Sequence, residues 1–188
     1  MWDNFTQQSL ANAKVALSIQ ERAWMGFGGV KPLHSPNAAG RFIYEGVTVN
    51  AHTELKNYGQ TPARKVQNRG NMKIFCKKFS NDPPYDESAI EIGIKSSSTF
   101  MPGREDWTAL AALDHPLTKD DISNLESKRC WLYFFAKSEY CDIFNIRHYR
   151  HLCAQWVPGT PFAFADCATY NDGDEDRPDQ KPQEYPAE

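Results

Sequence analysis

The sequence contains no long apolar run and no secretory signal. A helix needs about 20 consecutive apolar residues to cross the hydrocarbon core of a bilayer, and the apolar runs here are only a few residues long. The N-terminus also lacks a basic region followed by an apolar one, which is the pattern of a secretory signal peptide. These absences predict a chain that is soluble as given.

The charge shows no basic excess that would favour nucleic acid. The formal net charge is −3. The segment 171–188 holds seven acidic and two basic residues, or −5, which leaves +2 for residues 1–170. A nearly neutral body offers little attraction to a polyanion. The sequence therefore predicts no nucleic-acid partner, and the alternating basic residues of 65–77 are expected to form a solvated sheet face.

Closely spaced cysteines are missing as well. The five cysteines are odd in number, widely spaced and without a CxxC pair. Such a set is typical neither of a disulfide framework nor of a zinc site. Their thiols are therefore expected to stay reduced, which favours a reducing compartment such as the cytoplasm. The residues concerned are Cys76, Cys130, Cys141, Cys153 and Cys167.

What the sequence does have is sufficient length and many aromatic residues. Its 188 residues, of which 40% are hydrophobic and 13% aromatic, suffice for one packed core. We expect three parts: an N-terminal helix in residues 1–21, a β-sandwich domain in 22–170 and an acidic, flexible tail in 171–188. The tail carries too little apolar surface to order itself.

Alternation of apolar and polar residues predicts the strands. The clearest is 47–56, in which every second residue from Val47 to Leu55 shares one face. Further strands are predicted in 22–30, 65–77, 90–94 and 161–168, and in the two arms of a hairpin spanning 130–157. Because the strands do not alternate with helices, the expected fold class is mainly β. We predict an antiparallel immunoglobulin-like β-sandwich with an N-terminal helix and one short additional helix.

The short additional helix is predicted over 118–126. Thr118 would be its N-cap, and Asp121, three residues on, would complete a capping box. In the hairpin, a loop of Ile143, Phe144 and Asn145 is expected, since asparagine tolerates the left-handed conformation that closes a three-residue hairpin loop.

The stretch LKNYGQTPARKV, residues 55–66, lies between two predicted strands. A phosphate loop needs glycines that expose backbone amides and a helix that follows. Here one glycine is present, and Pro62 removes an amide rather than offering one. Gly59 can adopt a positive φ, and Pro62 forces Thr61 into an extended conformation. The stretch is therefore interpreted as a corner between two strands.

His148, His151 and Cys153 are the candidates for a metal or hydrolytic site. On a strand, residues of equal parity share a face. The expected loop places Cys153 opposite Phe135 and His151 opposite Lys137, with His148 on the other face. Convergence of all three side chains would require a bulge. We therefore predict no catalytic, cofactor-binding or metal-ligating residues, and a hydrolase or metal-dependent enzyme using these three residues is the alternative.

The acidic run NDGDED, residues 171–176, resembles the start of a calcium-binding loop. Asp172, Asp174 and Asp176 alternate as EF-hand ligands do. The final glutamate of such a loop is absent, because position 183 is Gln and Glu184 is out of register. The run is therefore expected to be a solvated part of the acidic tail.

Several stretches together resemble a family of uncharacterised bacterial proteins, mostly from Gram-negative species. The stretches are ERAWM (21–25), KNYGQTPARKV (56–66), LTKDDISNLESK (117–128), YCDIFNIRHYRHLC (140–153) and FADCATYNDGDED (164–176). The resemblance implies an N-terminal membrane anchor that leads through a helix into a β-sandwich, and no catalytic residues. Asn145 stands where the family usually has glycine. Because no membrane span precedes the helix, membrane association is expected only if an anchor precedes Met1.

These observations predict a protein without enzymatic activity. The expected function is that of an immunoglobulin-like interaction module, or one associated with the cell envelope, with no cofactor and with an unidentified protein partner. The exposed strand edges and the aromatic hairpin would supply the contact surface.

Overall fold

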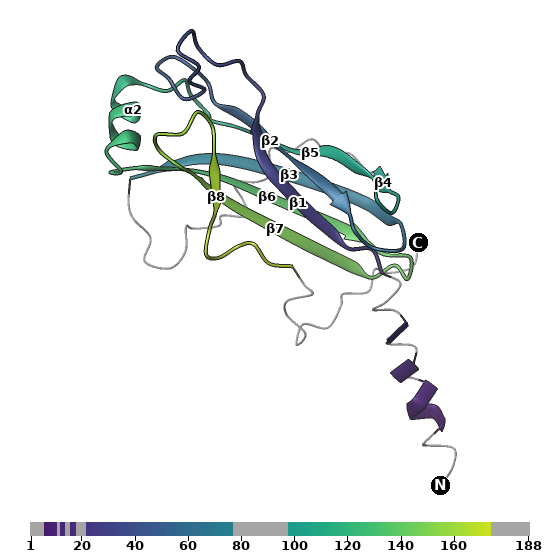
Figure 1. The fold of residues 1–188 in the computed structure, drawn as a ribbon. Helices are drawn as coiled ribbons and strands as arrows, with labels where there is room; N and C mark the ends of the chain where they lie inside the picture. The colour runs from purple at the N-terminus through teal and green to yellow at the C-terminus, as the bar shows by residue number, and fades with distance from the viewer. Residues whose placement is uncertain (1–5, 11, 14–15, 18–21, 77–97, 174–188) are drawn as a thin grey trace.

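The structure is a computed structural model that describes residues 6–10, 12–13, 16–17, 22–76 and 98–173. The predicted strand at 90–94 and most of the predicted acidic tail lie outside these residues. The described part is built from two antiparallel β-sheets and short helices (Figure 1). None of the helices in these segments is long and apolar enough to cross a membrane.

The first sheet contains three strands in the order β1-β2-β5. They are β1 (Met25–Pro32), β2 (Asn50–Asn57) and β5 (Glu105–Ala112). The predicted dry face of β2 is confirmed, because Ala51, Thr53 and Leu55 are fully buried. On β5, Ala109 and Ala111 lie opposite Thr53 and Ala51.

The second sheet contains five strands in the order β4-β3-β6-β7-β8. They are β3 (Ala63–Phe75), β4 (Ser98–Phe100), β6 (Trp131–Cys141), β7 (Arg147–Trp156) and β8 (Phe164–Asp166). Its inward face carries Leu132, Phe134 and Ala136 of β6, which belong to the main core cluster together with Ala109 and Ala111 of the other sheet.

The β6–β7 hairpin has the predicted register. Cys153 pairs with Phe135 and His151 with Lys137. The loop is also the predicted one, because the amide of Asp142 donates to the carbonyl of Ile146 and encloses residues 143–145. Asn145 has a φ of 63°, the left-handed conformation that its side chain tolerates. The Asp142 carboxylate accepts the amides of Phe144 and Ile146 and thereby holds the loop.

The helix α2 (Lys119–Glu126) packs at one end of the sandwich (Figure 1). The predicted capping box is confirmed: the Thr118 hydroxyl accepts the amide of Asp121, and the Asp121 carboxylate accepts the amide of Thr118. Residues 6–10, 12–13 and 16–17 are helical, as predicted for the N-terminus, and all of them are exposed. This helix projects from the opposite end of the sandwich (Figure 1).

The predicted fold class is confirmed at the level of a mainly antiparallel β-sandwich, while the immunoglobulin-like topology stays a prediction. The sequence analysis missed β4 and β5. The segment of β5, EDWTALAA, is rich in alanine, which is depleted in strands, and it follows directly on the Pro102-Gly103 turn. Its strand character comes from pairing with β2 rather than from its own composition.

The expectation that the cysteines remain reduced is wrong. Cys76 is bonded to Cys130 and Cys153 to Cys167, while Cys141 is free and buried. The cysteines are far apart in the sequence, but the sheet brings them together: Phe75 pairs with Trp131, so the residues that follow and precede this pair, Cys76 and Cys130, meet directly across β3 and β6.

Candidate functional site

The stretch 55–66 forms a corner that joins β2 to β3, as the sequence indicated. Asn57, the last residue of β2, is fully buried there. Its amide nitrogen donates to the carbonyls of Thr61 (2.8 Å) and Phe100 (3.0 Å). Its amide oxygen accepts the backbone N–H groups of Gly59 (2.9 Å) and Trp24 (3.3 Å). One side chain thus fixes the corner, the start of β1 and the end of β4, and it has no capacity left for a ligand.

Gly59 is required by the close approach of another backbone segment. A Cβ atom at this position would lie 2.5 Å from the Arg22 carbonyl oxygen and 2.5 Å from the Trp24 nitrogen. Backbone atoms cannot move aside as the end of a side chain can, so no larger residue fits without displacing the chain before β1. Gly59 is therefore needed because the corner packs closely against the backbone before β1.

The three candidate metal or catalytic residues do not converge. His148 faces the core and is buried, while His151 and Cys153 lie on the outward face of the same strand, as their parity predicted. The sulfur of Cys153 is bonded to Cys167 and is unavailable as a ligand or nucleophile. Among the described residues, no group of three or more His, Cys, Asp or Glu side chains could hold a metal ion. These three residues therefore do not form one site.

The buried His148 side chain contacts the carboxylate of Asp142 and the ring of Tyr140. Its Nε2 lies 3.1 Å from Oδ2 of Asp142, and its ring stacks on Tyr140 at a centroid distance of 5.3 Å. Burial alone would raise the pKa of Asp142, but the hydrogen bonds from His148 and from the loop amides outweigh it and lower the pKa. The carboxylate therefore stays charged and binds the hairpin loop to β7.

The segment after β8 is bound to the outward face of β7. Asn171 accepts the amide of Cys153 and donates to the carbonyls of Cys153 and Cys167. Oδ1 of Asp172 lies 3.1 Å from Nδ1 of His151. Together with the Cys153–Cys167 disulfide, these contacts extend the folded body to Gly173, which bridges to Arg150. We call residues 167–173 the C-terminal strap.

The strap includes the first part of the acidic run 171–176, with one of the three aspartates considered for calcium. Asn171 and Asp172 direct their polar atoms at β7 in the contacts just described. Asp174 and Asp176 lie outside the described residues.

The aromatic hairpin is less exposed than the sequence analysis assumed. Tyr133, Phe134, Phe135 and Tyr140 are all buried. Phe134 and Tyr140 face the core, whereas Tyr133 and Phe135 pack on the outward face with Phe75, Trp131, Tyr170 and the Cys153–Cys167 disulfide. The body of this hairpin therefore presents few of its aromatic rings for contact, and its exposed apolar side chains are Ile143 and Phe144 at the tip and Val157 at its end.

Five exposed apolar side chains belong to segments at the end of the sandwich from which the N-terminal helix projects: the start of β1, the β2–β3 corner, the β4–β5 turn and the β6–β7 loop (Figure 1). They are Trp24, Tyr58, Met101, Ile143 and Phe144. The amide of Tyr58 donates to the carbonyl of Trp24, and the side chain of Arg64, at the start of β3, donates to the carbonyl of Ile143. We call this surface, defined by these five exposed residues, the apolar end.

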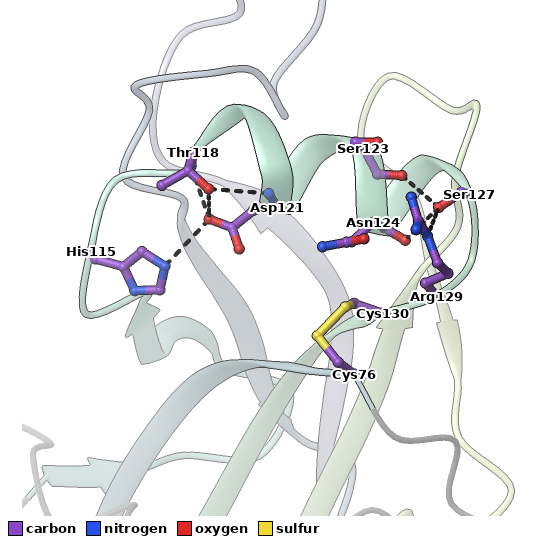
Figure 2. The surroundings of a disulfide bond; sticks show 9 residues. All are labelled: Cys76, His115, Thr118, Asp121, Ser123, Asn124, Ser127, Arg129 and Cys130. Atoms are coloured by element: carbon purple, nitrogen blue, oxygen red, sulfur yellow. Dashed lines mark hydrogen bonds and ion pairs between the residues drawn. A yellow bond between two sulfur atoms is a disulfide. The ribbon is translucent and has the colours of Figure 1, made fainter.

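The opposite end carries a pocket beside α2. Its walls come from the loop 39–43, from α2 and from the turn 159–161 after β7, and its volume is about 210 Å³. Figure 2 shows how this end is fixed: the capping box holds the start of α2, and the Cys76–Cys130 disulfide lies beneath its last turn. The amide of Cys130 donates to the carbonyl of Asn124, which ties the helix to the start of β6.

The pocket was not predicted from the sequence, because its walls are far apart along the chain and none carries a ligand-binding motif. The resemblance drawn from the ordered motifs likewise stays a prediction. No protein-family model, curated protein or solved structure matches the chain.

Proposed function

We propose that the chain is a non-enzymatic β-sandwich module that binds a partner protein through the apolar end. The observation that carries this proposal is the presence of five exposed apolar side chains at one end of the sandwich, with Tyr58 63% exposed. Large apolar side chains cost free energy in water, and contiguous exposed patches commonly mark interaction sites. Tyr, Trp, Phe and Met are also the residues enriched in protein interfaces.

The charges of the apolar end favour a partner with acidic groups around an apolar centre. Arg64 and Arg104 are exposed there. The nearby carboxylate of Glu105 is paired with Lys56 at 3.7 Å, and that of Glu139 with Arg147. The carboxylates are therefore partly neutralised, whereas Arg64 donates to uncharged backbone carbonyls and adds positive charge to the potential that steers a partner.

Site-specific photo-crosslinking tests the proposal. A photoreactive phenylalanine analogue replaces Phe144 in the protein expressed in its own cells, and the matched control carries it at Leu33, at the other end of the sandwich. Both positions are 43% exposed. We expect a discrete protein adduct from position 144, which Arg64→Glu weakens, and none from position 33. Equal adducts at both positions, or adducts with lipid alone at position 144, would contradict the proposal.

We also infer that the protein works in an oxidising compartment. Disulfides persist in secreted, periplasmic and cell-surface proteins and are rare in the cytosol, and two of them join β-strands here. Alkylation of the denatured but unreduced protein, isolated under acid quench, checks this inference. We expect only Cys141 to be labelled, whereas labelling of all five cysteines would contradict it.

A further inference from the structure

We propose that the acidic residues 174–176 bind the edge of β7 beside the hairpin loop, as a short antiparallel strand that continues the C-terminal strap. The strap ends at Gly173, which forms a bridge with Arg150 of β7. The docking site is the part of β7 between this bridge and the loop 143–145, namely residues 147–149. This inference does not depend on the partner-binding role proposed for the apolar end.

The strap already follows the edge of β7. The amide of His151 donates to the carbonyl of Asp172 at 2.8 Å, and the amide of Cys153 donates to the side chain of Asn171 at 2.9 Å. Both amides therefore point away from β6 and towards the edge of the sheet. Because the direction of the backbone groups alternates along a strand, those of residues 149 and 147 point to this edge as well.

The bridge between Arg150 and Gly173 sets the register of the residues that follow. In an antiparallel pair, each step backwards along one strand meets a step forwards along the other. Three steps from the bridge bring the acidic residues to the start of β7. The opposing pairs are Tyr149 with Asp174, His148 with Glu175, and Arg147 with Asp176.

The observed hydrogen bond at His151 also identifies which of these pairs exchange backbone bonds. Pairs with and without hydrogen bonds alternate along an antiparallel ladder. Tyr149 and Asp174 therefore form a hydrogen-bonded pair. His148 and Glu175 form a pair without backbone hydrogen bonds, in which the Cα atoms are about 4.5 Å apart.

The alternation of acidic residues matches the charges on the outward face of β7. Asp172 already uses this match, since its Oδ1 lies 3.1 Å from Nδ1 of His151. Residues 174 and 176 have the same parity and face the same way. Asp176 then lies opposite Arg147, and Asp174 lies diagonal to both Arg147 and His151. Opposite charges in such positions stabilise a pair of strands.

The neighbouring strands leave this face with an excess of positive charge. Lys137 and Arg147 both contact the carboxylate of Glu139, so that two cations share one anion. Arg69 of β3 lies opposite Lys137 and adds a further cation. An acidic strand at the edge of β7 therefore relieves repulsion among these side chains.

Pairing at this edge would also give the acidic segment a protective role. The exposed edge of a sheet can pair with strands of other molecules and lead to aggregation. β8 covers only residues 154–156 of β7, and the strap reaches residue 150. The segment 174–176 would extend this cover to the hairpin loop.

Nuclear magnetic resonance of the full chain tests the proposed register. The short Cα separation of a pair without hydrogen bonds brings the two Hα protons together. We expect a cross-strand contact between the Hα protons of His148 and Glu175. A contact of His148 with a different residue of the segment, or with none of them, would overturn the proposal.

Two proline variants, each of which removes one acidic residue, separate strand pairing from charge attraction. Proline has no N–H, and the amide at position 174 points to β7 whereas that at 175 points away from it. We expect Asp174→Pro to accelerate hydrogen exchange of the Tyr149 amide about tenfold or more, and Glu175→Pro to change it less than about twofold.

Three results of the exchange experiment would contradict the proposal. Unchanged exchange in Asp174→Pro would show that the segment does not pair with β7. Equal acceleration in both variants would show that charge alone attracts it. Protection of the Tyr149 amide that rises with protein concentration would show that a second copy of the chain occupies the edge instead.

Discussion

At the scale of single residues, Asn57 is the side chain on which the corner depends most. It makes four hydrogen bonds in a fully buried position. Asn57→Ala leaves two carbonyls and two amides without these partners, and each unsatisfied buried group costs about 1–3 kcal/mol. We expect a loss of at least about 3 kcal/mol in the free energy of unfolding, measured by urea denaturation. Asn37→Ala, which removes a similar turn contact from an exposed loop, is the control and should cost less than about 1 kcal/mol.

The environment of Asp142 leads to a prediction about how the stability of the protein depends on pH. Its pKa in the folded protein is lowered, chiefly because the hydrogen bond from His148 and those from the loop amides outweigh the effect of burial. The stabilisation that this carboxylate provides is therefore complete above its unfolded pKa of about 3.9 and is lost as the pH falls through the lower folded value. Asp142→Asn keeps an oxygen for the loop amides but carries no charge.

Urea denaturation of both proteins between about pH 7 and about pH 2 checks this prediction. The unaltered protein should be the more stable one at neutral pH, and the difference should shrink below about pH 4. Other carboxylates with lowered pKa values, such as Glu54 and Glu139, are common to both proteins and cancel in the difference. A difference that stays constant across this range would show that the charge of Asp142 does not contribute.

The sequence correctly predicted the roles of residues that depend only on near neighbours along the chain. Thr118, Asp121 and Asn145 were predicted correctly because a capping box and a hairpin loop depend on neighbours within a few positions. The partners of Cys76 and the burial of Trp156 were not predicted, because they depend on pairing between strands that are distant in sequence. The candidate pocket belongs to this second class, since its residues meet only in the folded chain.

At the scale of elements, the C-terminal strap depends on the Cys153–Cys167 disulfide. Closing a loop of about 15 residues stabilises a fold by about 3 kcal/mol through the entropy of the unfolded chain, and these two cysteines are 14 positions apart. We expect the double variant Cys153→Ala, Cys167→Ala to lose stability of this order. Hydrogen exchange should accelerate in residues 164–173 while the centre of β6 remains protected.

Cys141→Ala is the control for the strap variant, because it removes a buried thiol without breaking a disulfide. It should change hydrogen exchange in 164–173 very little. If both variants gave the same exchange pattern, the hydrogen bonds of the strap would hold it without the disulfide.

Alternation of apolar and polar residues was sufficient to predict some strands of this fold but not others. β2, β3, β6 and β7 were predicted because each has one apolar face or a long aromatic run of its own. β5 has few strand-forming residues, and pairing with β2 determines its conformation. A segment of this kind becomes recognisable only when the neighbouring strand is known.

At the scale of the whole molecule, Gly70 permits a close approach between the two sheets. It lies on β3 of the second sheet, and a Cβ atom there would be 2.5 Å from the carbonyl oxygen of Leu110 on β5 of the first. Gly70→Ala must push the sheets apart at a point where the core cluster joins them. Overpacking of this kind costs about 1–3 kcal/mol, and we expect a loss in the upper part of this range because the opposing atoms are backbone.

Gly29→Ala separates this packing effect from the general effect of replacing a glycine. Gly29 lies in the edge strand β1, and a Cβ atom there would meet nothing within 4 Å. Because alanine also reduces the entropy of the unfolded chain, Gly29→Ala should be neutral or slightly stabilising in urea denaturation. If Gly70→Ala were equally neutral, the sheets would tolerate a wider separation than their packing indicates, and the pocket and the apolar end would not be held at fixed positions by the core between them.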